Sequence, residues 1–236
     1  MRTWVLAALL VGAALSLSGC SGHVGGGSTS TAPPAVQTTP LTFTITTTTP
    51  TDTVATPTSK AYIGPNGLPM ETGSFLAPAT TTRLGAIVHG IQCEPMAQRA
   101  YQSYAHLQVY VHGHSRALPG GIGIVDENPI KTKQGLYYGA LTCMYWLHTR
   151  AADGLVEVQA PVSRRFTLGD LFAVWNQPLD ASRVAGARGR VTATVNGRRW
   201  HRNPALIPLA EREAIQLAVG KPVPAPQTVD WVGTNF

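Results

Sequence analysis

The sequence predicts an α+β fold, built mostly of antiparallel β-hairpins with one main helix at about residues 167–177. Apolar and polar residues alternate with period two in several segments of the C-terminal half, as is typical of half-buried strands. Turn residues such as Asn196-Gly197 separate these segments. A single segment instead carries apolar residues at helical spacing and stops at Pro178, which predicts the helix.

Two segments repeat one order of elements: a strand, a turn glycine, a return strand and an apolar segment beside a proline. The first covers residues 109–124 and starts within a predicted strand at 106–112. The second covers residues 191–219, where Asn196-Gly197 predicts a tight hairpin. We therefore interpret the two segments as degenerate repeats.

One strand pair and the helix are predicted between these repeats. Residues 144–148 and 155–158 are rich in apolar side chains and are expected to pair as strands. The helix begins after Thr167, a typical N-cap residue, and Asp170 stands three positions further on. This spacing predicts a short variant of the capping box.

The first 19 residues are typical of a bacterial signal peptide. Their apolar run, residues 4–15, is too short to cross a bilayer as a helix. The run is followed by Leu-Ser-Gly-Cys at residues 17–20, which resembles the lipobox of bacterial lipoproteins. The resemblance implies cleavage before Cys20 and anchoring by acyl chains such as palmitate on this residue. If the organism is Gram-negative, the resemblance to lipoproteins of such bacteria implies, through Ser21, the outer membrane, facing the periplasm or the cell surface.

The mature chain is predicted to have two parts. Cys20 is followed by a disordered tether up to residue 82, because 14 of residues 28–58 are Thr and prolines interrupt the segment. The globular domain is predicted to span residues 83–236. If Cys20 carries lipid, Cys93 and Cys143 remain as an even pair, which in an exported chain predicts a disulfide.

Three motifs stand within residues 90–219. They are Gly-Ile-Gln-Cys at 90–93, Cys-Met-Tyr-Trp-Leu-His-Thr at 143–149 and Phe-Thr-Leu-Gly-Asp-Leu-Phe at 166–172. Together they resemble an uncharacterised family of exported bacterial and archaeal proteins. The family pattern has further histidines, of which this chain keeps His106 and His148. The resemblance implies export and no particular activity.

His106 and His148 are the candidate metal ligands, because imidazole suits zinc or copper and the two residues are predicted to lie on neighbouring strands. Two histidines without a nearby carboxylate make a poor metal site. We therefore expect no cofactor, with zinc or copper as the alternative.

Five arginines form the candidate anion-binding cluster. No Asp or Glu occurs between Asp180 and Glu211, and Trp200 lies within the cluster. Guanidinium groups bind phosphate and carboxylate through paired hydrogen bonds. The expected partner is therefore an anionic envelope polymer or a protein, and nucleic acid is not expected outside the cytoplasm. The arginines are Arg188, Arg190, Arg198, Arg199 and Arg202.

These features favour a membrane-anchored cell-envelope lipoprotein that acts as a non-catalytic binding or interaction module. An enzyme is less expected, because the sequence has no G-x-S-x-G motif and Cys143, near His148, is assigned to the disulfide. A metal-binding or metal-dependent envelope protein that uses His106 and His148 is the alternative.

Replacing Cys20 by alanine tests the membrane anchor. In a bacterium that processes lipoproteins, we expect the full-length protein to take up labelled palmitate and to enter the detergent phase on phase separation. Each buried CH₂ of an acyl chain contributes about 0.8 kcal/mol to membrane affinity, so Cys20→Ala should lose both properties. Equal detergent partitioning of the two forms would contradict the anchor.

Overall fold

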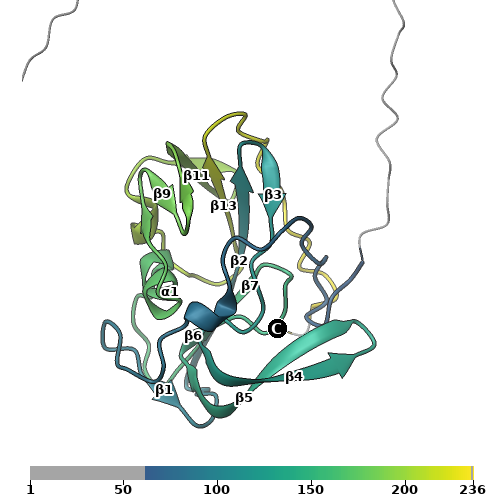
Figure 1. Cartoon of the computed structure of the whole chain (residues 1–236), viewed down its shortest axis with the longest axis vertical. Coiled ribbons are helices and arrows are strands. Elements are labelled where there is room, and N and C mark those ends of the chain that lie inside the picture. The colour runs from purple at the N-terminus through teal and green to yellow at the C-terminus, as the bar shows by residue number, and fades with distance from the viewer. Residues whose placement is uncertain (1–61, 235) are drawn as a thin grey trace, which may run out of the picture. The chain divides into compact units, whose positions relative to one another are not determined.

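The structure, a computed structural model, describes residues 62–234 and 236, which belong to one compact unit, Thr56–Phe236 (Figure 1). The predicted signal peptide, Cys20 and the tether up to residue 61 lie outside the described residues. Residues 62–82, also assigned to the tether by sequence, are part of the compact unit. Leu68 is fully buried there, and Phe75 forms a β-bridge with Ala117.

Short and long strands make up most of the described secondary structure. The α-helix α1 spans Leu168–Val174, and the 3-10 helices η1 and η2 span Ala79–Thr81 and Pro204–Leu206. The strands are β1 (Cys93–Glu94), β2 (Tyr101–Val111), β3 (His114–Arg116), β4 (Ile124–Thr132), β5 (Gly135–Tyr145), β6 (Leu147–His148), β7 (Leu155–Ala160), β8 (Leu179–Asp180), β9 (Arg183–Val184), β10 (Ala187–Arg188), β11 (Val191–Val195), β12 (Arg198–Trp200) and β13 (Glu213–Val219).

The predicted α+β fold is wrong, because the described residues form three β-sheets with one α-helix. The helix lies where its N-cap predicts: the Thr167 hydroxyl accepts from the Asp170 N–H, and the Asp170 carboxylate accepts from the Thr167 N–H. However, α1 has seven residues and ends at Val174. A helix of two turns is too short to form a layer over a sheet. Within the described residues, no helix is long and apolar enough to span a membrane.

The two predicted repeats do not occupy equivalent places, and this interpretation is also wrong. β2–β3 and β11–β12 do form antiparallel hairpins, the second with positive φ at Asn196 and Gly197. The segments that follow diverge. After the first hairpin the chain enters β4, in a different sheet, whereas β13 lies between β11 and β2 in the main sheet.

The main sheet has the order β12-β11-β13-β2-β7-β6, with β3 also paired to β2. β13 and β2 run parallel over seven residue pairs, from Glu213–Ala105 to Val219–Val111, and the other neighbours are antiparallel. The predicted pairing of residues 144–148 with 155–158 is confirmed in part, because β6 pairs with β7.

The two faces of the main sheet differ in chemistry, because alternate residues of a strand point to opposite sides. One face packs into the core against α1, where the Phe172 ring meets the ring of the C-cap residue Trp175 edge to face at 5.4 Å. Its residues include Ala105, Leu107, Val109, Val156, Val158, Ile215, Leu217 and Val219. The opposite face is polar, and its residues include Tyr104, His106, Gln108, Glu157, Gln159 and Gln216.

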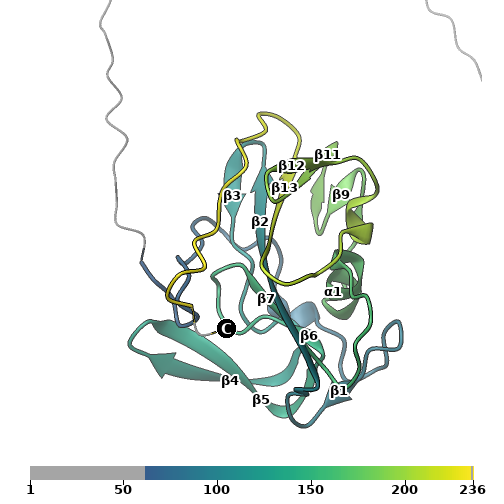
Figure 2. The ribbon, with the colours of Figure 1, turned by 180° about the vertical axis from the view of Figure 1, so that it is seen from behind.

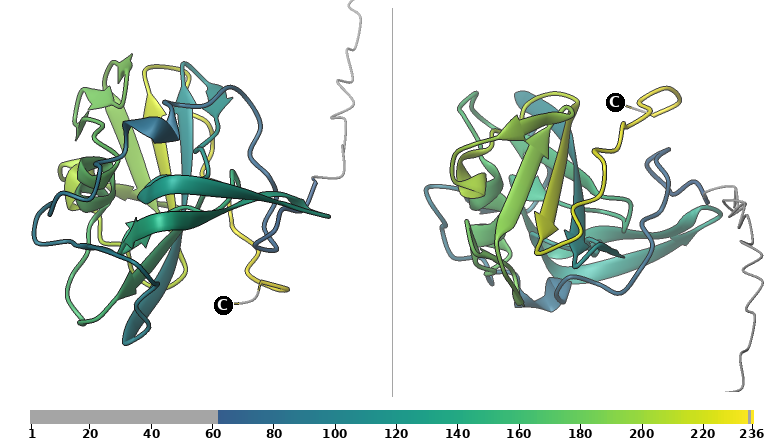
Figure 3. Two further views of the ribbon diagram at one scale, coloured as in Figure 1. Left: turned by 60° about the horizontal axis from the view of Figure 1, so that its bottom comes forward. Right: turned by 90° about the horizontal axis from the view of Figure 1, so that it is seen from above.

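Two segments without regular strands cross the polar face. Figure 2 shows the N-terminal segment, residues 62–77, and the C-terminal segment, residues 222–234, on the same side of β2 and β13. The second sheet, β1-β5-β4, contains a long β4–β5 hairpin that projects away from the strands of the main sheet (Figure 3).

A disulfide joins Cys93 of β1 to Cys143 of β5, which confirms the predicted pair. The two Cα atoms are 5.4 Å apart, and 50 positions separate the two residues in the sequence. The bond therefore closes a long loop that contains β2, the central strand of the main sheet.

Loss of this disulfide should destabilise the domain strongly. Closing a loop of about 50 residues stabilises by about 4 kcal/mol in the chain-entropy model. We expect the Cys93→Ser/Cys143→Ser variant to unfold at lower urea concentration than wild type, by about this free energy. Wild type unfolded under reducing conditions should match the variant, and equal stability of oxidised wild type and variant would contradict this role.

Candidate functional site

Three of the five predicted arginines line one cavity beside the β11–β12 hairpin. Arg199 lies on β12, and Arg190 and Arg202 lie next to the hairpin ends; with Trp200 they line a space of about 440 Å³. A second cavity of about 330 Å³ shares Arg190 and Arg199 and adds Lys221. We call the surface formed by Arg190, Arg199, Trp200, Arg202 and Lys221 the arginine groove.

The remaining two arginines of the predicted cluster, Arg188 and Arg198, line neither cavity. Arg198 is the first residue of β12, next to the Asn196-Gly197 turn, and Arg188 lies on β10. The structure therefore divides the predicted cluster, and three of its five arginines share one surface.

The groove arginines have no acidic partner in the described part of the chain, because no carboxylate there lies within 4.0 Å of their nitrogens. Elsewhere, arginines do pair: Arg183 lies 2.9 Å from Asp180, and Arg150 lies 3.4 Å from Glu157. The groove therefore concentrates positive charge that is open to an anion from outside the domain.

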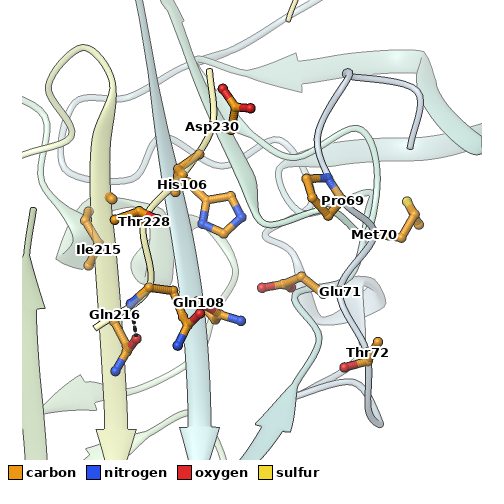
Figure 4. A pocket seen from close by; sticks show the side chains of 13 residues that line it. Pro69, Met70, Glu71, Thr72, His106, Gln108, Ile215, Gln216, Thr228 and Asp230 are labelled. Atoms are coloured by element: carbon orange, nitrogen blue, oxygen red, sulfur yellow. Dashed lines mark hydrogen bonds between the residues drawn. The ribbon is translucent and has the colours of Figure 1, made fainter. Parts of the chain in front are cut away.

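A different kind of cavity lies on the polar face of the main sheet (Figure 4). Its floor is formed by β2 and β13, and its two walls are residues 69–72 of the N-terminal segment and residues 227–230 of the C-terminal segment. The volume is about 240 Å³. We call this cavity the β2–β13 pocket.

Hydrogen bonds of backbone and side-chain groups hold both walls in place. The Glu71 N–H donates to the Ala152 carbonyl at 2.9 Å, and the Leu118 N–H donates to Glu71 Oε2 at 2.5 Å. On the other side, Gln216 of β13 donates to the Pro224 carbonyl and accepts from the Gln227 N–H, both at 3.1 Å. The pocket is thus formed before any ligand binds.

His106 and Glu71 meet beside Gly154, whose φ is +75°. A Cβ atom on this glycine would lie 2.6 Å from His106 Nε2 and 3.0 Å from Glu71 Oε1, so a glycine is required there. Glu71 Oε1 is buried and has no hydrogen-bond partner among the described residues. Asp153 lies next to this group, with Oδ1 accepting from Asn66 Nδ2 at 3.2 Å.

The environment shifts the protonation of these groups. Burial raises the pKa of Glu71 to about 8, against the hydrogen bond from Leu118, and the charge of Asp153 adds to the increase. Burial lowers the pKa of His106 to about 4 and raises the pKa of Asp153 to about 6. At pH 7, therefore, a neutral carboxylic acid lies beside a neutral imidazole.

His106 and His148 do not share a site. His106 is opposite Leu155 on β7, whereas His148 is opposite Glu157, two residues further along. With two strand spacings between them, the backbones are on the order of 12 Å apart. In residues 62–234 no three His, Cys, Asp or Glu side chains are grouped to hold a metal ion.

His148 instead belongs to a buried charge network around Glu157. Its Nε2 lies 3.5 Å from Glu157 Oε2, and Arg150 and Gln159 approach the same oxygen at 3.4 and 3.2 Å. Burial would raise the pKa of Glu157, but His148 and Arg150 outweigh it and hold the pKa below its ordinary value. Arg150 also lies over the Tyr137 ring, so these charges are partnered within the domain.

Sequence reasoning missed Glu71, Asp153 and Gln216. Glu71 was assigned to the tether, although the apolar Leu68-Pro69-Met70 before it departs from the Thr-rich composition and could have marked a docked segment. Asp153 reads as an ordinary turn residue before a glycine, because only the fold places it under Asn66. Gln216 occupies a polar position in an alternating strand, and sequence alone does not show what covers it.

Comparison of the chain with models of known protein families, with curated proteins and with solved structures finds no match. The resemblance of its motifs to a family of exported proteins stays a prediction.

Glu71→Gln should change how stability depends on pH. Between pH 4.5 and 8, folded Glu71 keeps its proton while the unfolded chain releases it, so wild type loses stability as pH rises through this window. The loss is on the order of a few kcal/mol. Glutamine keeps the acceptor for Leu118 without titrating, so the variant should gain on wild type from pH 5 to 8 in urea unfolding.

Two features make this measurement specific. His106 titrates in the opposite sense: its folded pKa of about 4 lies below its ordinary value of 6.5, so the domain loses stability as the pH falls below 6.5. This contribution is present in both proteins and cancels in the difference. Glu211→Gln removes an exposed carboxylate and serves as the control for net charge. Parallel pH profiles for wild type and Glu71→Gln would show that Glu71 does not carry a raised pKa.

Proposed function

We propose that this protein is a cell-envelope lipoprotein, anchored through Cys20, whose domain binds an anionic polymer of the envelope in the arginine groove. The observation that carries the proposal is the arrangement of Arg190, Arg199 and Arg202 around one cavity without a neighbouring carboxylate in the described residues. Its role is non-catalytic binding.

The chemistry of the groove favours phosphate or carboxylate groups on a flexible chain. Guanidinium groups form two parallel hydrogen bonds to either anion, and these charge-assisted bonds are about twice as strong as neutral ones. Two adjacent cavities share Arg190 and Arg199, so successive anionic groups of one polymer can contact the same arginines from both sides. The Trp200 ring offers an apolar surface to the part of the polymer between its charges.

Two further features support a place in the envelope. The Cys93–Cys143 disulfide is of a kind that persists outside the reducing cytosol. A signal peptide followed by an acylated cysteine would hold the domain at a membrane. A basic groove on a domain anchored in this way would be close to the anionic polymers of the envelope.

Arg199→Ala and Arg198→Ala form a matched pair for testing the groove. Both substitutions remove one positive charge from neighbouring positions of β12. Of these two arginines, only Arg199 lines the two cavities. Hydrogen bonds to charged groups contribute about 1.5–3 kcal/mol, so Arg199→Ala should weaken binding to lipopolysaccharide by about tenfold or more. Arg198→Ala should change it by less than about twofold.

Binding is measured with the full-length protein at low and at high salt. Wild-type affinity should fall as salt rises, because screening weakens contacts between exposed charges. Equal weakening by both substitutions would show that net charge acts rather than the groove. Salt-insensitive binding, or none, would remove the proposal.

A further inference from the structure

We propose that the β2–β13 pocket binds a single uncharged sugar ring. The pocket and the arginine groove have no residue in common, and their lining chemistry differs. The proposal therefore goes beyond the binding of an anionic polymer, and either site can exist without the other.

The space for a ring comes from small residues beside large ones on the polar face. Ala214 of β13 is the direct neighbour of His106 on β2, and Gln216 is the neighbour of Gln108. The short side chain of Ala214 leaves room next to the imidazole, which Figure 4 shows between the two walls. The resulting 240 Å³ is slightly smaller than a drug-sized pocket of about 300–1,000 Å³, which suits one ring.

The polar side chains of the pocket combine hydrogen-bond donors with acceptors. Each glutamine amide and each threonine hydroxyl offers both, and a neutral imidazole carries one donor and one acceptor nitrogen. A sugar hydroxyl is likewise donor and acceptor, so neighbouring hydroxyls can be satisfied without any charge on the protein. The residues of this kind are Thr72, His106, Gln108, Gln216, Gln227 and Thr228.

Apolar side chains form the rest of the lining. Pro69 and Met70 lie on the N-terminal wall and Val229 lies on the C-terminal wall, whereas Ile215 directs its side chain into the core and contributes only backbone to the floor. A sugar ring has one face of C–H groups and an edge of hydroxyls, and this mixed lining can match both.

The charges around the pocket select against ions. Asp230 is an exposed carboxylate on the C-terminal wall, and Asp153 lies buried beside Glu71, so an anionic ligand would meet negative charge. No arginine or lysine lines the pocket. Asp230 would attract a cationic ligand, but this ligand would also have to lose its water beside a Glu71 carboxyl that burial keeps protonated at neutral pH. An uncharged ligand avoids both costs.

The walls are held before binding, which lowers the entropy cost of association. Glu71 and Gln216 fix their two segments through the hydrogen bonds to Leu118, Pro224 and Gln227. A ring with few heavy atoms still offers limited contact, so we expect dissociation constants in the millimolar range.

Titration of the full-length protein with neutral hexoses and N-acetylhexosamines tests the pocket. We expect saturable binding of at least one of them, with changes in the NMR signals of His106 and Gln216. Glucuronate and glucosamine carry a charge on a similar ring and should bind at least about tenfold more weakly. Arg199→Ala should leave the sugar affinity unchanged, which separates this site from the arginine groove.

Ala214→Leu fills the pocket without replacing any of its polar groups and should abolish sugar binding. Ala225→Leu adds the same volume to the C-terminal segment outside the pocket and should bind as wild type does. If Ala214→Leu unfolds, the NMR changes in wild type decide alone. No saturable binding by any neutral sugar, a preference for a charged ring, or changes confined to other residues would overturn the proposal.

Discussion

The parallel pairing of β2 with β13 is the constraint on which the rest of the domain depends. It joins residues 101–111 to residues 213–219, and parallel neighbours require a long connection between them. Here that connection contains the disulfide-linked β4–β5 sheet, α1 and the β11–β12 hairpin. β11 pairs with the other edge of β13, and β12 pairs with β11, so Arg199 and Trp200 lie on the strand at one edge of the sheet. Both candidate surfaces therefore follow from one pairing.

Alternation along these strands separates stability from binding. The side that carries Leu107 and Leu217 is buried against α1, and apolar burial there contributes about 25 cal/mol per Å². The side that carries His106 and Gln216 is covered by two irregular segments held by individual hydrogen bonds. The core and the disulfide can thus stabilise the domain while the polar face keeps a cavity. The buried Glu71 fits this division, because its neutral form avoids most of the cost of a charge without water.

Local signals in the sequence predicted local structure. The alternation in β2, the Asn196-Gly197 hairpin, the Thr167 cap and the pairing of Cys93 with Cys143 all depend on residues whose types fix geometry or chemistry. The α+β assignment failed because a helical pattern predicts where a helix starts but not whether it is long enough to form a layer. The β2–β13 pairing and the docking of Glu71 join segments far apart in the chain, and no single residue type predicts such contacts. The same reason explains why His106 and His148, predicted as neighbours, face separate surroundings.

The polar groups of the groove and those of the pocket differ in what they cost the stability of the fold. Exposed arginines are solvated by water and counter-ions, so the absence of neighbouring carboxylates costs the fold little. What points to anion binding is that several of them line one cavity. A buried carboxyl with one free oxygen is expensive in a core, and glutamine could accept the same hydrogen bond from Leu118. Neither packing nor the hydrogen bond to Leu118 therefore requires a titratable group beside His106 and Asp153. Its presence leaves, next to a preformed cavity, an acid and an imidazole that are both neutral at pH 7, and such a surface is suited to hydroxyl groups rather than to ions.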